Sequence, residues 1–74
     1  MSRPVKRSLT LRGHRTSVTL EDEFWQAFRE IAEASGKGIN ELAAEIDEDR
    51  GVETGLATAI RLHVLAHYRQ RREP

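Results

Sequence analysis

The 74-residue sequence contains no cysteine, and only 5% of its residues are aromatic. The absence of cysteine excludes a disulfide framework and a thiolate metal site, and it suits a reducing cytoplasm. No apolar run approaches the roughly 20 residues of a membrane-spanning helix, and the basic N-terminal segment lacks the apolar core of a signal peptide. We therefore expect a cytoplasmic protein without a membrane partner.

The chain is also short. A domain of this size buries only about 60% of the surface that its unfolded chain exposes, so a partner subunit is a reasonable expectation. We predict a flexible lead at residues 1–4, a single domain at residues 5–71 and a tail at residues 72–74.

The net charge is zero, but the charges are distributed unevenly along the chain. Residues 1–20 hold five bases and no acid, which gives +5. Residues 21–53 hold eleven acids against three bases, which gives −8, and residues 54–74 hold four bases against one acid, which gives +3. The N-terminal quarter of the chain is therefore positively charged, and this charge could attract the phosphate backbone of a nucleic acid.

Two segments in this positive region, residues 5–11 and 15–20, alternate between polar and apolar side chains and predict β-strands. In the second segment one face carries Thr16, Val18 and Leu20, and the other carries Arg15, Ser17 and Thr19. Between the segments, Gly13–His14 predicts a two-residue type II′ turn, because glycine suits its first central position. That turn would place Arg12 opposite Arg15, and such a pair of like charges weakly favours a nearby anion.

A helix is predicted at residues 22–35, where Thr19 and Asp22 have the spacing of a capping box and Gly36 suits a left-handed C-cap. A second helix is predicted at residues 39–49, with Gly38 as its N-cap.

A third helix is predicted at residues 55–71. It is apolar over more than half of its circumference because Leu62 and Leu65 widen its apolar face. A face this broad indicates a helix that is either enclosed by the domain or pressed against another subunit.

These segments contain short sequence motifs that resemble those of a known family. They are K-R-S-L-T-L-R-G-H-R-T-S-V-T-L-E-D-E-F-W, G-x-G-I-N-E-L, A-E-I-D and A-I-R-L-H-V-L-A-H-Y-R. Together, over about residues 6–69, they resemble ribbon-helix-helix proteins, the bacterial DNA-binding family, in a short form with an extra N-terminal strand and a C-terminal helix. The resemblance implies a mostly helical α+β fold with an N-terminal β-hairpin and three helices, assembled as an intertwined homodimer.

The resemblance also implies a function, that of a dimeric transcriptional regulator. Two chains would pair one strand each into a ribbon that reads base edges in the major groove of double-stranded DNA, while the N-terminus of the second helix holds a phosphate. The candidate nucleic-acid-binding residues are Arg15, Ser17, Thr19, Arg12, Lys6, Gly38, Ile39 and Asn40. The residues expected in the core or dimer interface are Thr16, Val18, Leu20, Trp25, Phe28, Ile39, Leu42, Ile46, Ile60 and Val64.

A different class of function stays open. The extra strand widens the ribbon, and a wider ribbon fits less readily into the DNA major groove of about 12 Å. The alternative is a homodimeric protein–protein interaction module, or an antitoxin-like partner, that does not bind DNA.

Enzymatic and metal functions have little support in the sequence. His63 and His67 are four residues apart and share a helix face, yet no cysteine and no obvious third ligand accompany them. No spacing suggests a nucleophile and base pair, and so small a chain cannot enclose a substantial pocket. We expect no enzyme activity, no bound metal and no cofactor.

Overall fold

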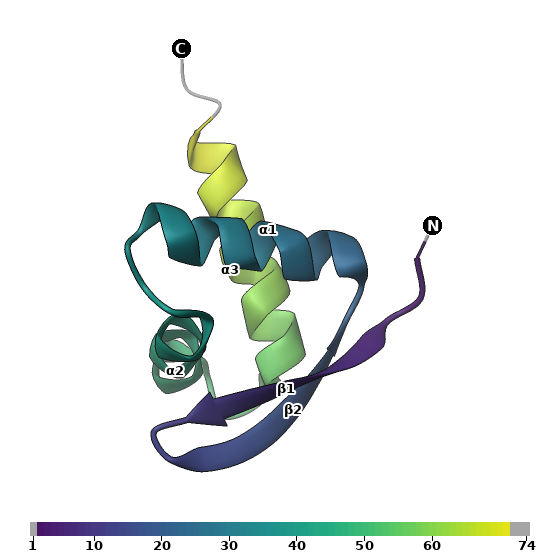
Figure 1. Ribbon diagram of the computed structural model, residues 1–74. Helices are drawn as coiled ribbons and strands as arrows, with labels where there is room; N and C mark the ends of the chain where they lie inside the picture. The colour runs from purple at the N-terminus through teal and green to yellow at the C-terminus, as the bar shows by residue number, and fades with distance from the viewer. Residues whose placement is uncertain (1, 72–74) are drawn as a thin grey trace.

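Two strands are followed by three helices in residues 2–71, the part of the chain that the computed structural model describes (Figure 1). In order they are β1 (Val5–Leu11), β2 (His14–Leu20), α1 (Asp22–Ala34), α2 (Ile39–Asp49) and α3 (Leu56–Gln70). The predicted α+β fold, a hairpin followed by three helices, is confirmed. The tail expected at residues 72–74 lies outside the described residues.

The core lies between the inner face of the hairpin and the helices. Leu20 of β2, Phe28 of α1 and Ile60 of α3 have no solvent exposure. Most of the residues predicted for the core are buried or pack against it: Val18, Leu20, Trp25, Phe28, Ile39, Leu42, Ile46, Ile60 and Val64. The exception is Thr16, which shares the inner side of the hairpin with Val18 but is exposed.

The hairpin turn differs from its prediction. Leu11 pairs with His14, so the two-residue turn is Arg12–Gly13 rather than Gly13–His14, and β2 begins at His14, one residue earlier than predicted. Both turn residues have positive φ, 50° at Arg12 and 86° at Gly13, as a type I′ turn requires. Arg15 therefore lies opposite Thr10 instead of Arg12, and the predicted pair of facing arginines does not form.

Helix α1 begins after Glu21, which is its N-cap and makes no side-chain capping hydrogen bond. The predicted capping box is therefore wrong, because Thr19 still belongs to β2. At the other end Gly36 has φ 72°, and its N–H donates to the Glu33 carbonyl while that of Lys37 donates to the Ala32 carbonyl. This pair of bonds is a Schellman motif, so the left-handed C-cap is confirmed, although the helix ends at Ala34, one residue before its predicted end.

Helices α2 and α3 occupy different positions around the hairpin. The N-terminus of α2 adjoins β1, where the Asn40 side-chain oxygen accepts a hydrogen bond from the Thr10 N–H at 2.9 Å. Helix α3 begins beside the hairpin and runs away from it past α1 (Figure 1). It is the longest helix in residues 2–71, with 15 residues, and none of the helices there is long and apolar enough to cross a membrane.

The outer side of α3 is not covered by any other part of residues 2–71. Leu62 and Leu65, which widen its apolar face, are 56% and 51% exposed. Of the two arrangements predicted for this helix, enclosure by its own domain is therefore wrong.

The left-handed C-cap gives a first test of the fold. Replacing Gly36 by alanine should lower the free energy of unfolding by about 1 kcal/mol, because φ of 72° strains a residue with a Cβ while the added Cβ itself meets no atom within 4 Å. Urea unfolding followed by circular dichroism measures the change.

Gly51→Ala is the control, because Gly51 caps no helix in residues 2–71 and has no positive φ, and an added Cβ would meet only the Thr54 hydroxyl at an ordinary 3.9 Å. It should change stability by less than about 0.5 kcal/mol. Equal losses in the two variants would contradict the assigned role of the positive φ.

Candidate nucleic-acid interface

The outer face of the hairpin is a continuous polar surface. Alternation along the two paired strands brings six exposed side chains to it: Lys6, Ser8, Thr10, Arg15, Ser17 and Thr19. Four are hydroxyl residues, two are bases and none is an acid. Arg15, Ser17 and Thr19 thus lie together on the face predicted for them, and Lys6 lies opposite Thr19 across the hairpin.

The bases of the hairpin divide into free and engaged groups. Among the ion pairs of residues 2–71, none involves Lys6 or Arg15. Arg12 is paired with Glu48 near the end of α2, and this hydrogen bond is the main cause that raises the pKa of Arg12. The turn arginine, predicted to contact nucleic acid, is therefore held by an acid of its own chain.

Arg7 is engaged on the inner side. Its guanidinium lies over the Trp25 ring, 5.4 Å from the centroid, and is 3.4 Å from a carboxylate oxygen of Asp22. Its Nε is buried, with no hydrogen-bond partner among the described residues. An arginine at an inner strand position was not assigned any role from sequence, and only its alternation with the outer residues signals where it points.

The N-terminus of α2 lies beside the outer edge of β1. Gly38 is the N-cap and makes no side-chain capping hydrogen bond, so capping leaves the first backbone N–H groups of the helix unoccupied. Gly38 and Asn40 are exposed, and Ile39 is partly buried against the core. The Asn40–Thr10 bond fixes this end of α2 relative to the hairpin.

Arg61 of α3 joins three elements and was also missed by sequence reasoning. Its guanidinium donates to the Glu21 carboxylate at 2.9 and 3.1 Å and to the Thr19 carbonyl at 3.3 Å, and it lies over the Phe24 ring. These contacts hold the end of β2 and the start of α1 against α3. The only signal in the sequence was a lone arginine on an otherwise apolar helix face.

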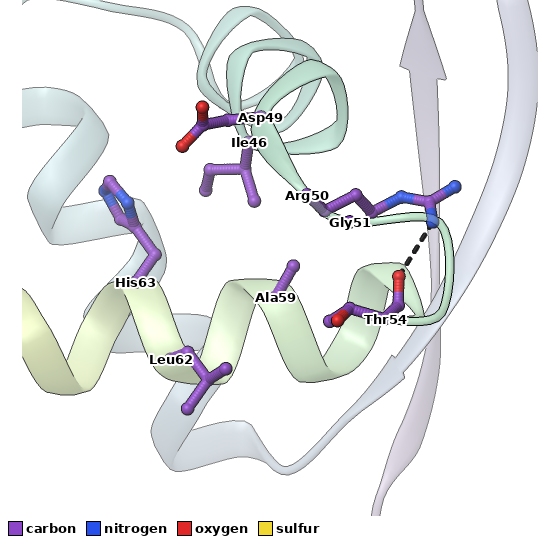
Figure 2. A pocket seen from close by; sticks show the side chains of 8 residues that line it. All are labelled: Ile46, Asp49, Arg50, Gly51, Thr54, Ala59, Leu62 and His63. Carbon is purple, nitrogen blue, oxygen red and sulfur yellow. Dashed lines mark hydrogen bonds between the residues drawn. The ribbon is translucent and has the colours of Figure 1, made fainter.

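A groove of about 300 Å³ lies between α2 and α3, away from the hairpin's polar face. Ile46, Asp49, Ala59 and His63 point into it (Figure 2). Burial, and then the neighbouring charge of His67, lower the pKa of His63. His67 packs edge-on against the Tyr68 ring, at 5.0 Å between centroids. In residues 2–71 no group of three or more metal-binding side chains is gathered.

The hairpin with its polar outer face, followed by helices that cover its inner face, defines a small α+β domain of the ribbon-and-helices class. A family model described as a ribbon-helix-helix domain matches residues 4–68. The chain therefore belongs to the ribbon-helix-helix family, whose members are typically DNA-binding transcription regulators or antitoxins. Searches of the curated proteins and of the solved structures found no match.

The Glu21–Arg61 contact makes stability depend on pH. A hydrogen bond from its own backbone, and then the bonds from Arg61, lower the pKa of Glu21. A lowered pKa adds stability above the unfolded-state value of about 4.3, and this contribution is lost as pH falls through the folded-state pKa. We therefore expect the free energy of unfolding of Glu21→Gln to fall less between pH 6 and pH 3 than that of the wild type.

Glu53→Gln is the control, since Glu53 is exposed and has no ion pair in residues 2–71. Its pH dependence should match that of the wild type in urea unfolding at each pH. Parallel curves for Glu21→Gln and the wild type would exclude the contact as a source of the dependence.

Proposed function

We propose that this protein is a homodimeric transcriptional regulator whose β-hairpin enters the major groove of double-stranded DNA. The observation that carries the proposal is the outer face of the hairpin, where two bases that form no ion pair within residues 2–71 stand among four hydroxyl side chains and no acid. Phosphate attraction supplies affinity to such a surface, and side chains aimed at base edges supply specificity.

The side chains of the outer face have suitable chemistry for base reading. Arg15 can donate two parallel hydrogen bonds to O6 and N7 of guanine, the commonest specific contact in the major groove. The hydroxyls of Ser17 and Thr19 can donate or accept, so they fit several base edges. Lys6, at the other end of the hairpin, is placed to meet a phosphate, which attracts its point charge.

The edge of β2 that faces away from β1 offers a second copy a place to pair. The Thr19 carbonyl points away from β1, since it accepts a bond from Arg61. Because peptide groups alternate in direction along an antiparallel strand, those of Arg15 and Ser17 also point out of this edge. We place the two-fold axis at Ser17, the middle residue of β2, so that two β2 strands form the centre of the ribbon.

The N-terminus of α2 is the proposed phosphate clamp. The N–H groups of its first turn, at Gly38, Ile39 and Asn40, are not occupied by a side-chain cap, and they carry the positive end of the helix dipole. The Asn40 oxygen is already bonded to Thr10, so the backbone and the Asn40 amide nitrogen are the donors left for DNA.

The decisive experiment is a DNA-binding measurement on Arg15→Ala. The wild type should shift a fragment of its own promoter region, with an affinity that falls steeply as salt rises. Arg15→Ala should lose about 1–3 kcal/mol of binding free energy per specific contact and should discriminate less between DNA sequences. Fluorescence anisotropy with a labelled duplex measures both effects.

Arg71→Ala removes the same charge at the C-terminal end of α3, remote from the hairpin (Figure 1). It should leave specific binding close to that of the wild type. If Arg15→Ala bound the fragment as tightly and selectively as the wild type, Arg15 would not be a base-reading residue.

Strand pairing can be tested with a single thiol because the chain has no cysteine of its own. Mild oxidation of Ser17→Cys should yield a disulfide-linked dimer, since residues directly opposite in antiparallel strands are about 5 Å apart. Thr10→Cys, on the same face but on the strand whose other edge adjoins α2, should stay monomeric in non-reducing electrophoresis. Linkage of Thr10→Cys but not Ser17→Cys would place the dimer axis elsewhere.

The width of the assembled sheet favours a second candidate function. Pairing through β2 gives the strand order β1-β2-β2-β1, and its outer strands would be about 14 Å apart, against a groove of about 12 Å. The same dimer would then be a protein–protein interaction module or an antitoxin-like partner. Absence of DNA affinity at low salt, together with a co-purifying protein, would favour this function.

A further inference from the structure

The outer side of α3 carries an exposed strip that the proposed contact with DNA does not use. The strip consists of Thr58, Leu62, Leu65, Ala66 and Arg69, all of them exposed. Leu62 borders the groove between α2 and α3, where it is one of the lining residues, and it is still 56% exposed (Figure 2). Single exposed leucines are ordinary on protein surfaces, but two leucines one turn apart form a small apolar patch.

The spacing of the strip is that of a helix-pairing seam. Thr58, Leu62, Leu65 and Arg69 are separated by four, three and four residues, the alternation of a and d positions in a heptad repeat. The two leucines occupy the centre, and a polar residue stands at each end. A seam of this kind buries its central residues against a second helix.

We propose that the strip packs against the same strip of a second copy of this chain, with the two α3 helices antiparallel. In that register Leu62 lies opposite Leu65 of the second copy, and Thr58 lies opposite Arg69 of the second copy. The strip is thus complementary to itself about its midpoint. A two-fold symmetric contact requires this property, because the same surface serves both partners.

Charge selects the antiparallel orientation. Helix α3 has no acidic residue, so a parallel pair would set Arg69 against Arg69 of the second copy with nothing to neutralise them. Antiparallel pairing separates these two arginines and gives each a Thr58 hydroxyl as its neighbour. Like charges that face one another along a seam are unfavourable, and their separation removes that cost.

The position of α3 also favours a second copy over an unrelated partner. Arg61 on the same helix bonds the Thr19 carbonyl at the edge of β2 that faces away from β1, so α3 borders the edge at which we place the other subunit. The strip therefore continues the proposed dimer surface from the strand onto the helix. This inference concerns self-association alone and does not depend on DNA binding.

The test compares the association of wild type and Leu65→Asp by sedimentation equilibrium over a series of concentrations. Burial of a charge at the centre of the seam in both copies should raise the dissociation constant about a hundredfold or more. The matched control is Val52→Asp, the same chemical change at a fully exposed residue in the loop before α3. It should associate as the wild type does.

Circular dichroism checks that both variants keep their helices, as expected for changes at exposed positions. Association of Leu65→Asp equal to that of the wild type would overturn the proposal, as would a wild type that stays monomeric throughout the series. The oxidation of Ser17→Cys and the DNA affinity of Arg15→Ala report separately on the ribbon, so a failure of the seam is distinguishable from a failure of the proposed function.

Cysteine pairing tests the orientation. An oxidised mixture of Leu62→Cys and Leu65→Cys, one of them carrying a size tag, should give mainly the mixed disulfide, because antiparallel packing sets these two positions opposite each other. Efficient linkage of each variant to itself would indicate parallel helices and overturn the proposed arrangement.

Discussion

The structure depends on the meeting of three side chains that water does not reach: Leu20 from β2, Phe28 from α1 and Ile60 from α3. Each comes from a different element, so their burial brings the hairpin and two helices together. An aliphatic or aromatic side chain of this size contributes about 1.5–3 kcal/mol on burial, which is a large share of the stability of so short a chain. Because Leu20 is the last residue of β2, the strand's alternation then determines that Arg15, Ser17 and Thr19 face outward.

Charge is arranged to complement this packing. The acidic middle of the chain supplies Asp22, Glu21 and Glu48, which engage Arg7, Arg61 and Arg12 respectively. Ion pairs at a protein surface usually add little to stability, but these pairs determine which bases of the hairpin stay accessible. With Arg7 and Arg12 engaged, the positive charge left on the hairpin is concentrated on its outer face, at Lys6 and Arg15. Although the net charge is zero, the charges are therefore unevenly distributed over the surface.

Much of this fold could be predicted from the sequence because its periodicities are clear. The alternation in residues 5–11 gave the bounds of β1, and the apolar repeat in residues 39–49 gave those of α2. The turn could not be predicted equally well. Moving the turn by one residue shifts each cross-strand partner by two residues and leaves every side chain on the same face, so the alternating pattern fits both turns. Arg12 then adopts the positive φ that composition alone would assign to glycine or asparagine.

The candidate site was predictable to a lesser degree. Alternation placed Arg15, Ser17 and Thr19 on one face, but Arg61 and Asn40 act through contacts between distant segments, which local patterns do not contain. Thr16, Leu62 and Leu65 are exposed in this chain, because a pattern gives the direction of a side chain and not whether another element covers it. The bond from Thr10 to Asn40 also holds the N-terminus of α2 against the outer edge of β1, near the turn of the hairpin, whereas the Thr19 carbonyl that Arg61 contacts lies at the other end of β2. Sheets with two open edges can add chains without limit and form fibrils, and a helix held against one edge obstructs the addition of a strand there.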